Sequence, residues 1–296
     1  MSRIRETFAC LKRACRGGFI PFITAGDPDL ATTERLLIEL AAVGADIIEL
    51  GVPFSDPVAD GETIQRASER ALRNGVTVRD ILTCVAHAKR HIDVPIVLFS
   101  YFNPLLSFGT DRLANDAKEA GVDAVLVTDL IPEEAHTWTE TLIQFDLDPI
   151  FLVAPTTSDQ RLKQIARQAR GFIYAVSRAG VTGARDEMTD DAEALVKRVR
   201  SVSDLPVAVG FGISTPEQVR QVWKFAEAAV IGSAIVCEID RLSGESDLVK
   251  QLGEFARRCS GRSKSAPSKT DRGSRHAPAS PPEKKRHHEQ YQKYKE

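Results

Sequence analysis

The sequence predicts an α/β fold in which eight parallel strands close into a (β/α)8 barrel. Short apolar runs rich in β-branched residues recur eight times, and segments with helical periodicity separate them. These runs are apolar almost throughout, as expected for parallel strands that are covered on both faces. Eight strand–helix units in about 250 residues match the size of a TIM barrel. A doubly wound open sheet is the alternative, but no G-x-G-x-x-G turn opens the first helix.

The predicted elements follow one another in regular order. An amphipathic helix extra to the barrel is predicted at the N-terminus, where Ile4, Phe8, Leu11 and Cys15 share one face. The predicted strands lie at residues 19–25, 46–52, 95–101, 123–129, 149–155, 171–177, 206–212 and 228–234. Amphipathic segments between them include residues 30–44, 62–75, 112–121, 158–169 and 193–202.

Composition is that of a water-soluble globular protein, with 43% hydrophobic and 27% charged residues. The apolar runs are all shorter than the roughly 20 residues of a membrane span. The N-terminal segment lacks the apolar centre of a signal peptide. Five scattered cysteines form no C-x-x-C pair, which favours reduced thiols without structural zinc. We therefore expect a cytoplasmic protein.

The charge distribution divides the chain into two parts. The segment 260–296 contains ten Lys and Arg residues against four Asp and Glu, so the remaining chain carries a net charge of −8. This basic, Ser/Pro-rich tail has too few aliphatic residues to form a core, and we expect it to be disordered. Nucleic-acid binding is an alternative use of such a tail, but a solvated extension is favoured. The predicted catalytic domain is 1–259.

The segment IELGVPFSDPVADG (residues 48–61) brings three carboxylates close to the end of one strand. Glu49 lies inside the apolar run, where burial raises the pKa of a carboxyl and favours a group that gives and takes a proton near neutrality. An ion pair or backbone hydrogen bonds would be the structural alternative for Glu49. Asp60 is a second acid–base candidate or simply the N-cap of the next helix. Asp56 fits an ordinary turn.

Glycine-bearing loops after the sixth, seventh and eighth strands predict a phosphate site. SRAGVTGAR (177–185), VGFGIS (209–214) and VIGSAIV (230–236) place glycine where the backbone can approach an anion, and the last two precede expected helix starts. Loops after strands seven and eight often bind phosphate in such barrels. His87 and His91 have i, i+4 spacing on a helix with charged neighbours, and we expect surface histidines rather than metal ligands. No metal site is predicted.

These motifs together resemble the tryptophan synthase alpha subunit family. The resemblance rests on ELGVPFSDPVADG, SYFNP, SRAGVTG, GFGIS and GSAIV, and it covers residues 1–258. It implies retro-aldol cleavage of indole-3-glycerol phosphate to indole and glyceraldehyde 3-phosphate, without cofactor or metal. It further implies that indole passes to a beta subunit for tryptophan biosynthesis, in an α2β2 complex whose pyridoxal phosphate belongs to the beta subunit.

The resemblance also implies roles for individual residues. Glu49 would shuttle protons, Asp60 would hold the indole N–H, and Tyr174 would orient Glu49. The positions that match substrate-binding residues of the family are Phe22, Phe99, Thr182, Gly183, Gly212, Gly232 and Ser233. Pro53, Asp56, Asn103 and Pro104 match positions at the interface with the beta subunit, which gives Asp56 a second interpretation outside the chemistry.

Three features depart from the family pattern. Glu62 replaces a proline after ADG, Phe99 is bulkier than the usual aliphatic residue, and the basic tail has no counterpart. The rival functions are an indole-producing lyase that works without a beta subunit, another phosphosugar barrel such as an isomerase, and a non-catalytic binding protein. The presence of Glu49, Asp60 and Tyr174 argues against lost catalysis.

Overall fold

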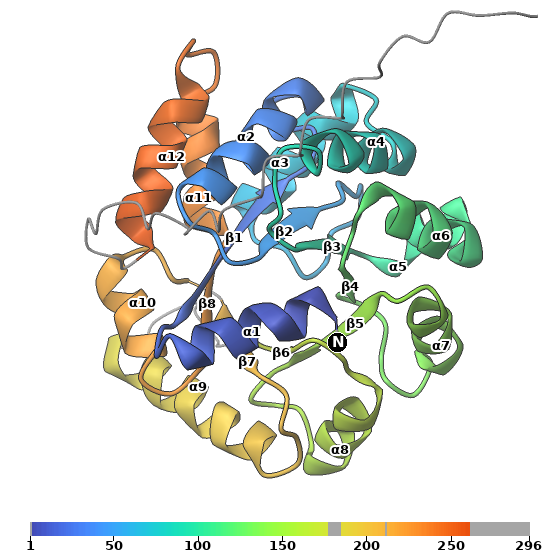
Figure 1. Cartoon of the computed structure of the whole chain (residues 1–296), viewed down its shortest axis with the longest axis vertical. Helices are drawn as coiled ribbons and strands as arrows, with labels where there is room; N and C mark the ends of the chain where they lie inside the picture. Colours follow the sequence, from blue (N-terminus) through green and yellow to red (C-terminus); the bar gives the residue numbers. More distant parts are fainter. Residues whose placement is uncertain (1, 177–184, 211, 261–296) are drawn as a thin grey trace, which may run out of the picture. The chain divides into compact units, whose positions relative to one another are not determined.

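A computed structural model describes residues 2–176, 185–210 and 212–260. Eight parallel strands follow one another around a closed barrel, and β8 pairs with β1 to complete it. Helices surround the barrel, while the first helix, α1, lies across one end of it (Figure 1). The predicted (β/α)8 barrel with an extra N-terminal helix is confirmed. The order of the strands rules out the doubly wound alternative.

The described elements alternate along the chain as the sequence predicts, with additional helices in several connections. The strands are β1 (Gly18–Thr24), β2 (Ile48–Gly51), β3 (Ile96–Ser100), β4 (Ala124–Val127), β5 (Asp148–Val153), β6 (Ile173–Val176), β7 (Val207–Gly210) and β8 (Ala228–Ile231). The helices are α1 (Arg3–Arg13), α2 (Leu30–Ala42), α3 (Glu62–Arg73), α4 (Val78–Ala88), α5 (Phe102–Phe108), α6 (Thr110–Ala120), α7 (His136–Gln144), α8 (Asp159–Gln168), α9 (Arg185–Arg200), α10 (Pro216–Val222), α11 (Ser233–Arg241) and α12 (Leu248–Cys259).

Side-chain caps fix where many of the helices begin. Ser2, Asp29 and Ser158 each accept a hydrogen bond from a backbone N–H in the first turn that follows them. Thr77 and Thr215 form capping boxes with residues three positions later. These short polar side chains satisfy N–H groups that have no partner inside a helix, so each helix start is encoded locally.

The alternation of side chains along each strand creates two separate apolar layers. On β2, Ile48 and Leu50 belong to the layer between the sheet and the helices. Ile47 points the other way, into a cluster that fills the barrel with Val97 and Tyr174. Because every second residue of a strand points to the same face, Glu49 faces the barrel interior together with Ile47.

Helix α1 closes the end of the barrel at which the strands begin. Its buried residues Ile4, Phe8 and Leu11 join the interior cluster, as predicted. Cys15 was expected on the same face, but α1 ends at Arg13 and Cys15 is exposed in a left-handed conformation with φ of 48°. The helix stops there because the chain turns into β1.

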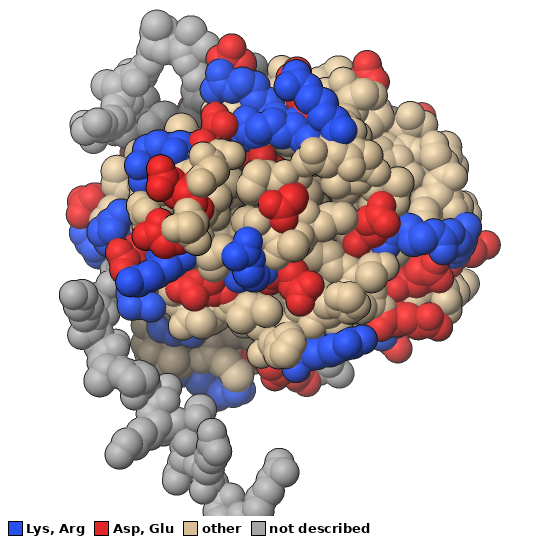
Figure 2. Space-filling model, turned by 90° about the horizontal axis from the view of Figure 1, so that it is seen from above, with Lys and Arg blue, Asp and Glu red and all other residues tan. Residues whose placement is uncertain are grey.

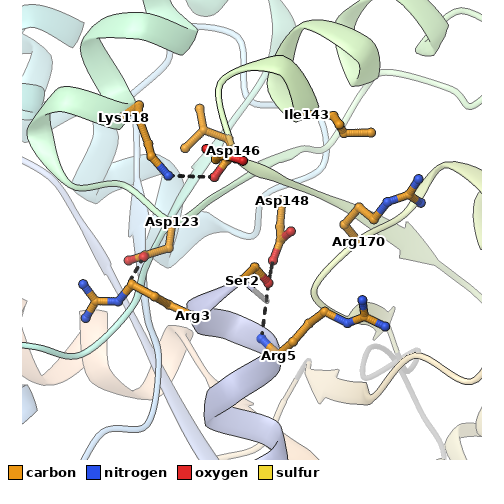
Figure 3. Close-up of a pocket in the computed structure, with 10 residues that line it drawn as sticks. Ser2, Arg3, Arg5, Lys118, Asp123, Ile143, Asp146, Asp148 and Arg170 are labelled. Carbon is orange, nitrogen blue, oxygen red and sulfur yellow. Dashed lines mark hydrogen bonds and ion pairs between the residues drawn. The ribbon is translucent and has the colours of Figure 1, made fainter.

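Polar contacts hold the first turn of α1 against the strand starts (Figure 3). The Ser2 hydroxyl donates to Asp148 at the beginning of β5, over 2.5 Å. Arg3 pairs with Asp123, just before β4, at 3.3 Å. Asp123 also pairs with Lys89 at 3.1 Å. These contacts fix the position of α1 relative to β4 and β5.

Several predicted boundaries differ from the structure. The strand expected at 228–234 ends at Ile231, because Gly232 is the N-cap of α11 and Ser233 is its first residue. The apolar run therefore contains a strand end and a helix start. His87 lies in α4, but that helix ends at Ala88, so His91 is not on the same helix as expected. His87 faces Glu34 at 3.6 Å.

The charged surface is mixed in sign on the face seen in Figure 2, where acidic, basic and uncharged side chains are interspersed. Within the described residues, no helix is both long and apolar enough to cross a membrane. Helix α12 ends at Cys259, beside the predicted domain boundary. Residues 261–296 lie outside the described residues, so the disordered tail stays a prediction.

Removing a buried side chain from α1, the helix that closes the barrel, should lower the stability of the fold. Phe8 is buried and packs its ring 5.7 Å from that of Phe172. We expect Phe8→Ala to lower the free energy of unfolding by about 3–5 kcal/mol, since it removes a large core side chain and leaves a cavity. Urea unfolding measures the change, with Lys12→Ala on the exposed face of α1 as control. Equal stability of both variants would contradict the closing role of α1.

Candidate active site

Glu49 occupies the barrel interior in the middle of β2. It pairs in register with Phe22 of β1 and with Val97 of β3, so neighbouring strands enclose it on both sides. The residue is 1% exposed, and its Oε1 atom has no hydrogen-bond partner within the described chain. The structural alternative for Glu49, an ion pair or backbone hydrogen bonds, is not observed at this oxygen.

Burial changes the protonation of this carboxyl. Desolvation raises the pKa of Glu49 from 4.5 to about 8, because the charged form loses its hydration in an apolar interior. The carboxyl is accordingly protonated at neutral pH. Because this pKa lies close to neutral pH, the group can both donate a proton and take one back, as acid–base catalysis requires.

Three aromatic rings surround the space next to Glu49. Phe22 and Phe99 meet edge to face with their centroids 5.3 Å apart, and Phe99 lies 6.5 Å from Tyr174. Tyr174 is 5% exposed, and its pKa is raised well above 10 by burial and then by the neighbouring Glu49. The hydroxyl therefore keeps its proton and can donate a hydrogen bond. The site combines an apolar wall with a carboxyl and a phenol.

Glycines on neighbouring strands make room for these rings. A Cβ atom added to Gly210 on β7 would stand 2.0 Å from the Tyr174 hydroxyl. One added to Gly51 on β2 would stand 2.5 Å from the Phe22 ring. Both distances are far below van der Waals contact, so a side chain at either position would displace a ring of the site.

Asp60 is the last residue of the loop that follows β2, and it is partly buried. It is not the N-cap of α3: Gly61 takes that position, without a side-chain hydrogen bond, and Glu62 begins the helix. Burial raises the pKa of Asp60 to about 6, while hydrogen bonding with Tyr101 lowers it. Asp60 thus ionises at a lower pH than Glu49.

Tyr101 and Arg70 are two residues of this region that the sequence analysis did not select. Tyr101 directly follows β3, the position where barrel enzymes place functional side chains, and this was the signal available. Arg70 lies in α3 among charged residues and resembles an ordinary surface position. Only the fold places it next to its acidic partners.

Arg70 connects three elements around the site. Its guanidinium binds both carboxylate oxygens of Asp27, at 2.7 and 2.9 Å, and Asp27 is 2% exposed after β1. It also pairs with Asp240 of α11 at 2.9 Å. Because α3 follows Asp60 and α11 follows Gly232, the ion pairs hold the two ends of the site together.

The glycines predicted to bind phosphate differ in their surroundings. Gly232 precedes α11 directly, has no side-chain cap on that helix, and has Phe22 side-chain atoms within 4 Å of the place where a Cβ would stand. Ser233 is exposed in the first turn. Gly212 has φ of 70° but does not adjoin a helix, since α10 begins at Pro216 with its own capping box. Thr182 and Gly183 lie outside the described residues.

The predicted partner residues lie in the loop after β2, which holds Pro53 and Asp56, and in the first turn of α5, which holds Asn103 and Pro104. Pro53, Asn103 and Pro104 line one hollow beside Phe54, while Asp56 is exposed at the loop tip and accepts a hydrogen bond from Ser55. Pro53 is buried within the chain itself.

Exposed apolar side chains lie in the segments that follow β2, β3 and β4. Val58 is 87% exposed after β2, Leu106 is 54% exposed in α5 after β3, and Ile131 is 40% exposed after β4. Consecutive loops of a barrel are neighbours at one rim, so these residues offer apolar surface at the rim that carries the site.

The part of the chain that the structure describes contains no cluster of three or more His, Cys, Asp or Glu side chains suited to a metal ion. The acidic groups of the site are instead set apart by their environments. Glu49 is enclosed by apolar rings, and Asp60 lies in a loop beside a tyrosine hydroxyl.

Comparison with known proteins gives one consistent result. The model of the family described as "Tryptophan synthase alpha chain" matches residues 8–264. The tryptophan synthase alpha chain of Citrifermentans bemidjiense is 51% identical over 255 residues, which cover 86% of this chain and 95% of that protein.

Solved structures agree with the sequence match. The tryptophan synthase alpha subunit of Legionella pneumophila superposes with a TM-score of 0.81 at 37% identity, covering 88% of this chain and 98% of that one. A chain of the tryptophan synthase α2β2 complex of Pyrococcus furiosus gives 0.78 at 41% identity, covering 83% and 98%.

Removing the buried carboxyl should stabilise the protein in alkaline solution. The folded state holds the Glu49 proton more tightly than the unfolded state, so this group contributes stability that is complete below pH 4.5 and is lost as the pH rises to about 8. We expect Glu49→Gln to be more stable than the parent by up to about 4 kcal/mol at pH 8, with the difference vanishing near pH 4.5.

Urea unfolding at several pH values measures this difference. Glu6→Gln, on the exposed face of α1, is the control for the same chemical change outside the barrel. A constant difference between Glu49→Gln and the parent across the whole range would show that Glu49 is not held protonated.

Proposed function

The chain belongs to the tryptophan synthase alpha chain family, and from this and its site we propose that it cleaves indole-3-glycerol phosphate to indole and glyceraldehyde 3-phosphate in tryptophan biosynthesis. The observation that carries the proposal is Glu49, a protonated carboxyl inside the barrel with one oxygen unpaired. A buried oxygen without a partner costs free energy, which a substrate can recover by binding there.

The reaction breaks the bond between C3 of the indole ring and the glycerol chain. Glu49 first gives its proton to C3, which makes that carbon tetrahedral and places positive charge on the ring nitrogen. The resulting carboxylate then takes the proton of the adjacent side-chain hydroxyl. The hydroxyl carbon becomes the aldehyde, the electrons of the broken bond restore the aromatic ring, and Glu49 ends protonated as it began.

Asp60 supports the same step from the other side of the ring. As a carboxylate it accepts a hydrogen bond from the indole N–H and stabilises the positive charge that develops there. Its pKa of about 6 and that of Glu49 near 8 leave a range in which one group is charged and the other neutral. This separation supports the two proposed roles.

The remaining side chains bind and orient the substrate. Phe22 and Phe99 provide the apolar wall for the indole ring, and Tyr174 orients Glu49. Gly232 and Ser233 at the start of α11, together with Gly212, bind the phosphate through backbone N–H groups. Thr182 and Gly183 complete this site as the family resemblance implies.

A beta subunit is the partner that we propose for the rim beside the site. The Pyrococcus furiosus relative is part of an α2β2 complex. Here, Pro53, Asp56, Asn103 and Pro104 are the proposed contacts, and the exposed Leu106 next to them fits an interface. Pyridoxal phosphate belongs to that partner, and this chain needs no cofactor for the steps above. The five free cysteines are consistent with a cytoplasmic location.

Two measurements separate the competing functions. Indole release from indole-3-glycerol phosphate, with and without a beta subunit, distinguishes the channelled enzyme from a lyase that works alone; strong turnover without the partner favours the latter. Deleting residues 261–296 tests the tail, because a solvated extension leaves indole release and beta-subunit activation unchanged. Salt-sensitive nucleic-acid binding that vanishes with the deletion would indicate another role.

The two carboxyls predict a bell-shaped dependence of indole release on pH. Activity should rise through about pH 6 as Asp60 ionises and fall through about pH 8 as Glu49 loses its proton. Asp60→Asn should reduce kcat by at least about 100-fold, since it removes the charge opposite the ring nitrogen. An isomerase acting on a related phosphate ester would keep its turnover in this variant.

The exposed apolar rim predicts where the beta subunit binds. Leu106→Asp should weaken binding by about tenfold or more, because a charge would be buried in the interface. Ile143→Asp is the matched control: Ile143 is likewise exposed, at 40%, but lines a hollow with Ser2 at the opposite end of the barrel. Titration calorimetry with purified beta subunit measures both, and equal effects would contradict this placement.

A further inference from the structure

Tyr101 connects the end of β3 to the loop that carries Asp60. Its side chain is 3% exposed, and its hydroxyl accepts a hydrogen bond from the Ala59 N–H over 2.9 Å. Ala59 immediately precedes Asp60, so the phenol holds the backbone beside the carboxylate. The Phe54 ring, from the start of the same loop, packs 5.2 Å from the Tyr101 ring.

The backbone of Tyr101 is held in place as well as its hydroxyl group. Tyr101 follows β3 directly and is the N-cap residue of α5. The next backbone N–H, that of Phe102, donates to Asp129, just after β4, over 2.7 Å. The backbone at the base of the phenol is therefore anchored to the ends of β3 and β4, and not to the loop that carries Asp60.

The hydroxyl has one proton to donate, and it interacts with the side chains of Asp60 and Thr128, of which only Asp60 can carry a charge. Hydrogen bonding with Tyr101 favours the ionised form of Asp60, against the effect of burial. Burial and then the negative charge of Asp60 raise the pKa of Tyr101 to about 12, so the phenol remains a donor throughout the range in which the enzyme works. A hydrogen bond from a neutral donor to a carboxylate is among the stronger ones in proteins.

We propose that Tyr101 is the positioning residue of the indole site: its hydroxyl holds one carboxylate oxygen of Asp60, so that the other is directed at the ring N–H of the substrate. This inference rests on the proposed role of Asp60. It gives the rigid barrel control over a carboxylate that the chain places in a loop, where the backbone alone would leave its direction poorly defined.

Tyr101→Phe is the direct test, since it keeps the ring against Phe54 and removes only the hydroxyl. We expect kcat for indole release to fall about tenfold, and the acidic limb of the pH profile to move upward by about one pH unit, as the loss of one charge-assisted hydrogen bond implies. Phe54→Leu is the matched control. It disturbs the packing around the same ring, and its acidic limb should stay in place.

A binding measurement separates positioning from stability. Indole-3-propanol phosphate lacks the side-chain hydroxyl and cannot be cleaved, and its benzofuran counterpart also lacks the N–H. The parent should prefer the indole compound, and Tyr101→Phe should lose about tenfold of that preference while binding the benzofuran compound nearly as before. Equal weakening for both compounds would mean a general structural defect and would overturn the inference.

The double variant distinguishes this inference from the function on which it rests. With Asp60→Asn in place, adding Tyr101→Phe should change kcat less than about twofold, because the two residues act as a unit. If Asp60→Asn abolishes activity but Tyr101→Phe changes neither kcat nor the acidic limb, the positioning role is wrong and the function stands. If Asp60→Asn keeps full activity, the proposed role of Asp60 itself fails.

Discussion

The pairing of β8 with β1 is the constraint on which the site depends. It joins the first and last strands over four residue pairs and turns an open sheet into a closed wall. With α1 across one end, the interior is an apolar space filled by side chains of the strands and of residues that directly precede them. A carboxyl in such a space loses its hydration and keeps its proton, so the chemistry of Glu49 follows from the closure of the sheet.

Depth within the barrel then distinguishes two carboxyls of similar intrinsic acidity. Glu49 lies between paired strands, where the backbone is fixed and water is excluded. Asp60 lies later in the chain, in a loop, where it is partly buried beside a hydroxyl. One is neutral and the other charged under the same conditions. Position alone thus gives two ordinary carboxyl groups different pKa values, as the proposed roles of acid and electrostatic partner require.

The barrel fold and the choice of Glu49 as a candidate residue could both be predicted from the sequence, because both leave local patterns. Apolar runs separated by helical periods predict the strand order, and a carboxylate inside such a run is costly unless it is paired or used in chemistry. It could not decide whether Glu49 faced the interior, since alternation defines two faces without naming them. It also failed at a boundary: the strand predicted at 228–234 runs past Gly232, although a helix start was expected directly after that glycine.

The sequence also could not predict contacts between residues that are far apart along the chain. Tyr101 and Asp60 are 41 residues apart, and nothing in either motif indicates that one touches the other. Cys15 shows the reverse error, because its helical spacing continues past the point at which the chain turns. Local propensity describes where an element can form, while the packing around it decides where it stops.

The ion pairs of Arg70 bear on which substrates can fit. They attach α3, which follows Asp60, the carboxyl proposed to bind the ring nitrogen, to α11, which follows Gly232, proposed to bind the phosphate. A guanidinium bound at both oxygens of a buried partner allows little sliding between these helices. If these two positions bind the ring nitrogen and the phosphate as proposed, we expect them to select phosphate esters by the length of the chain that joins the aromatic ring to the phosphate.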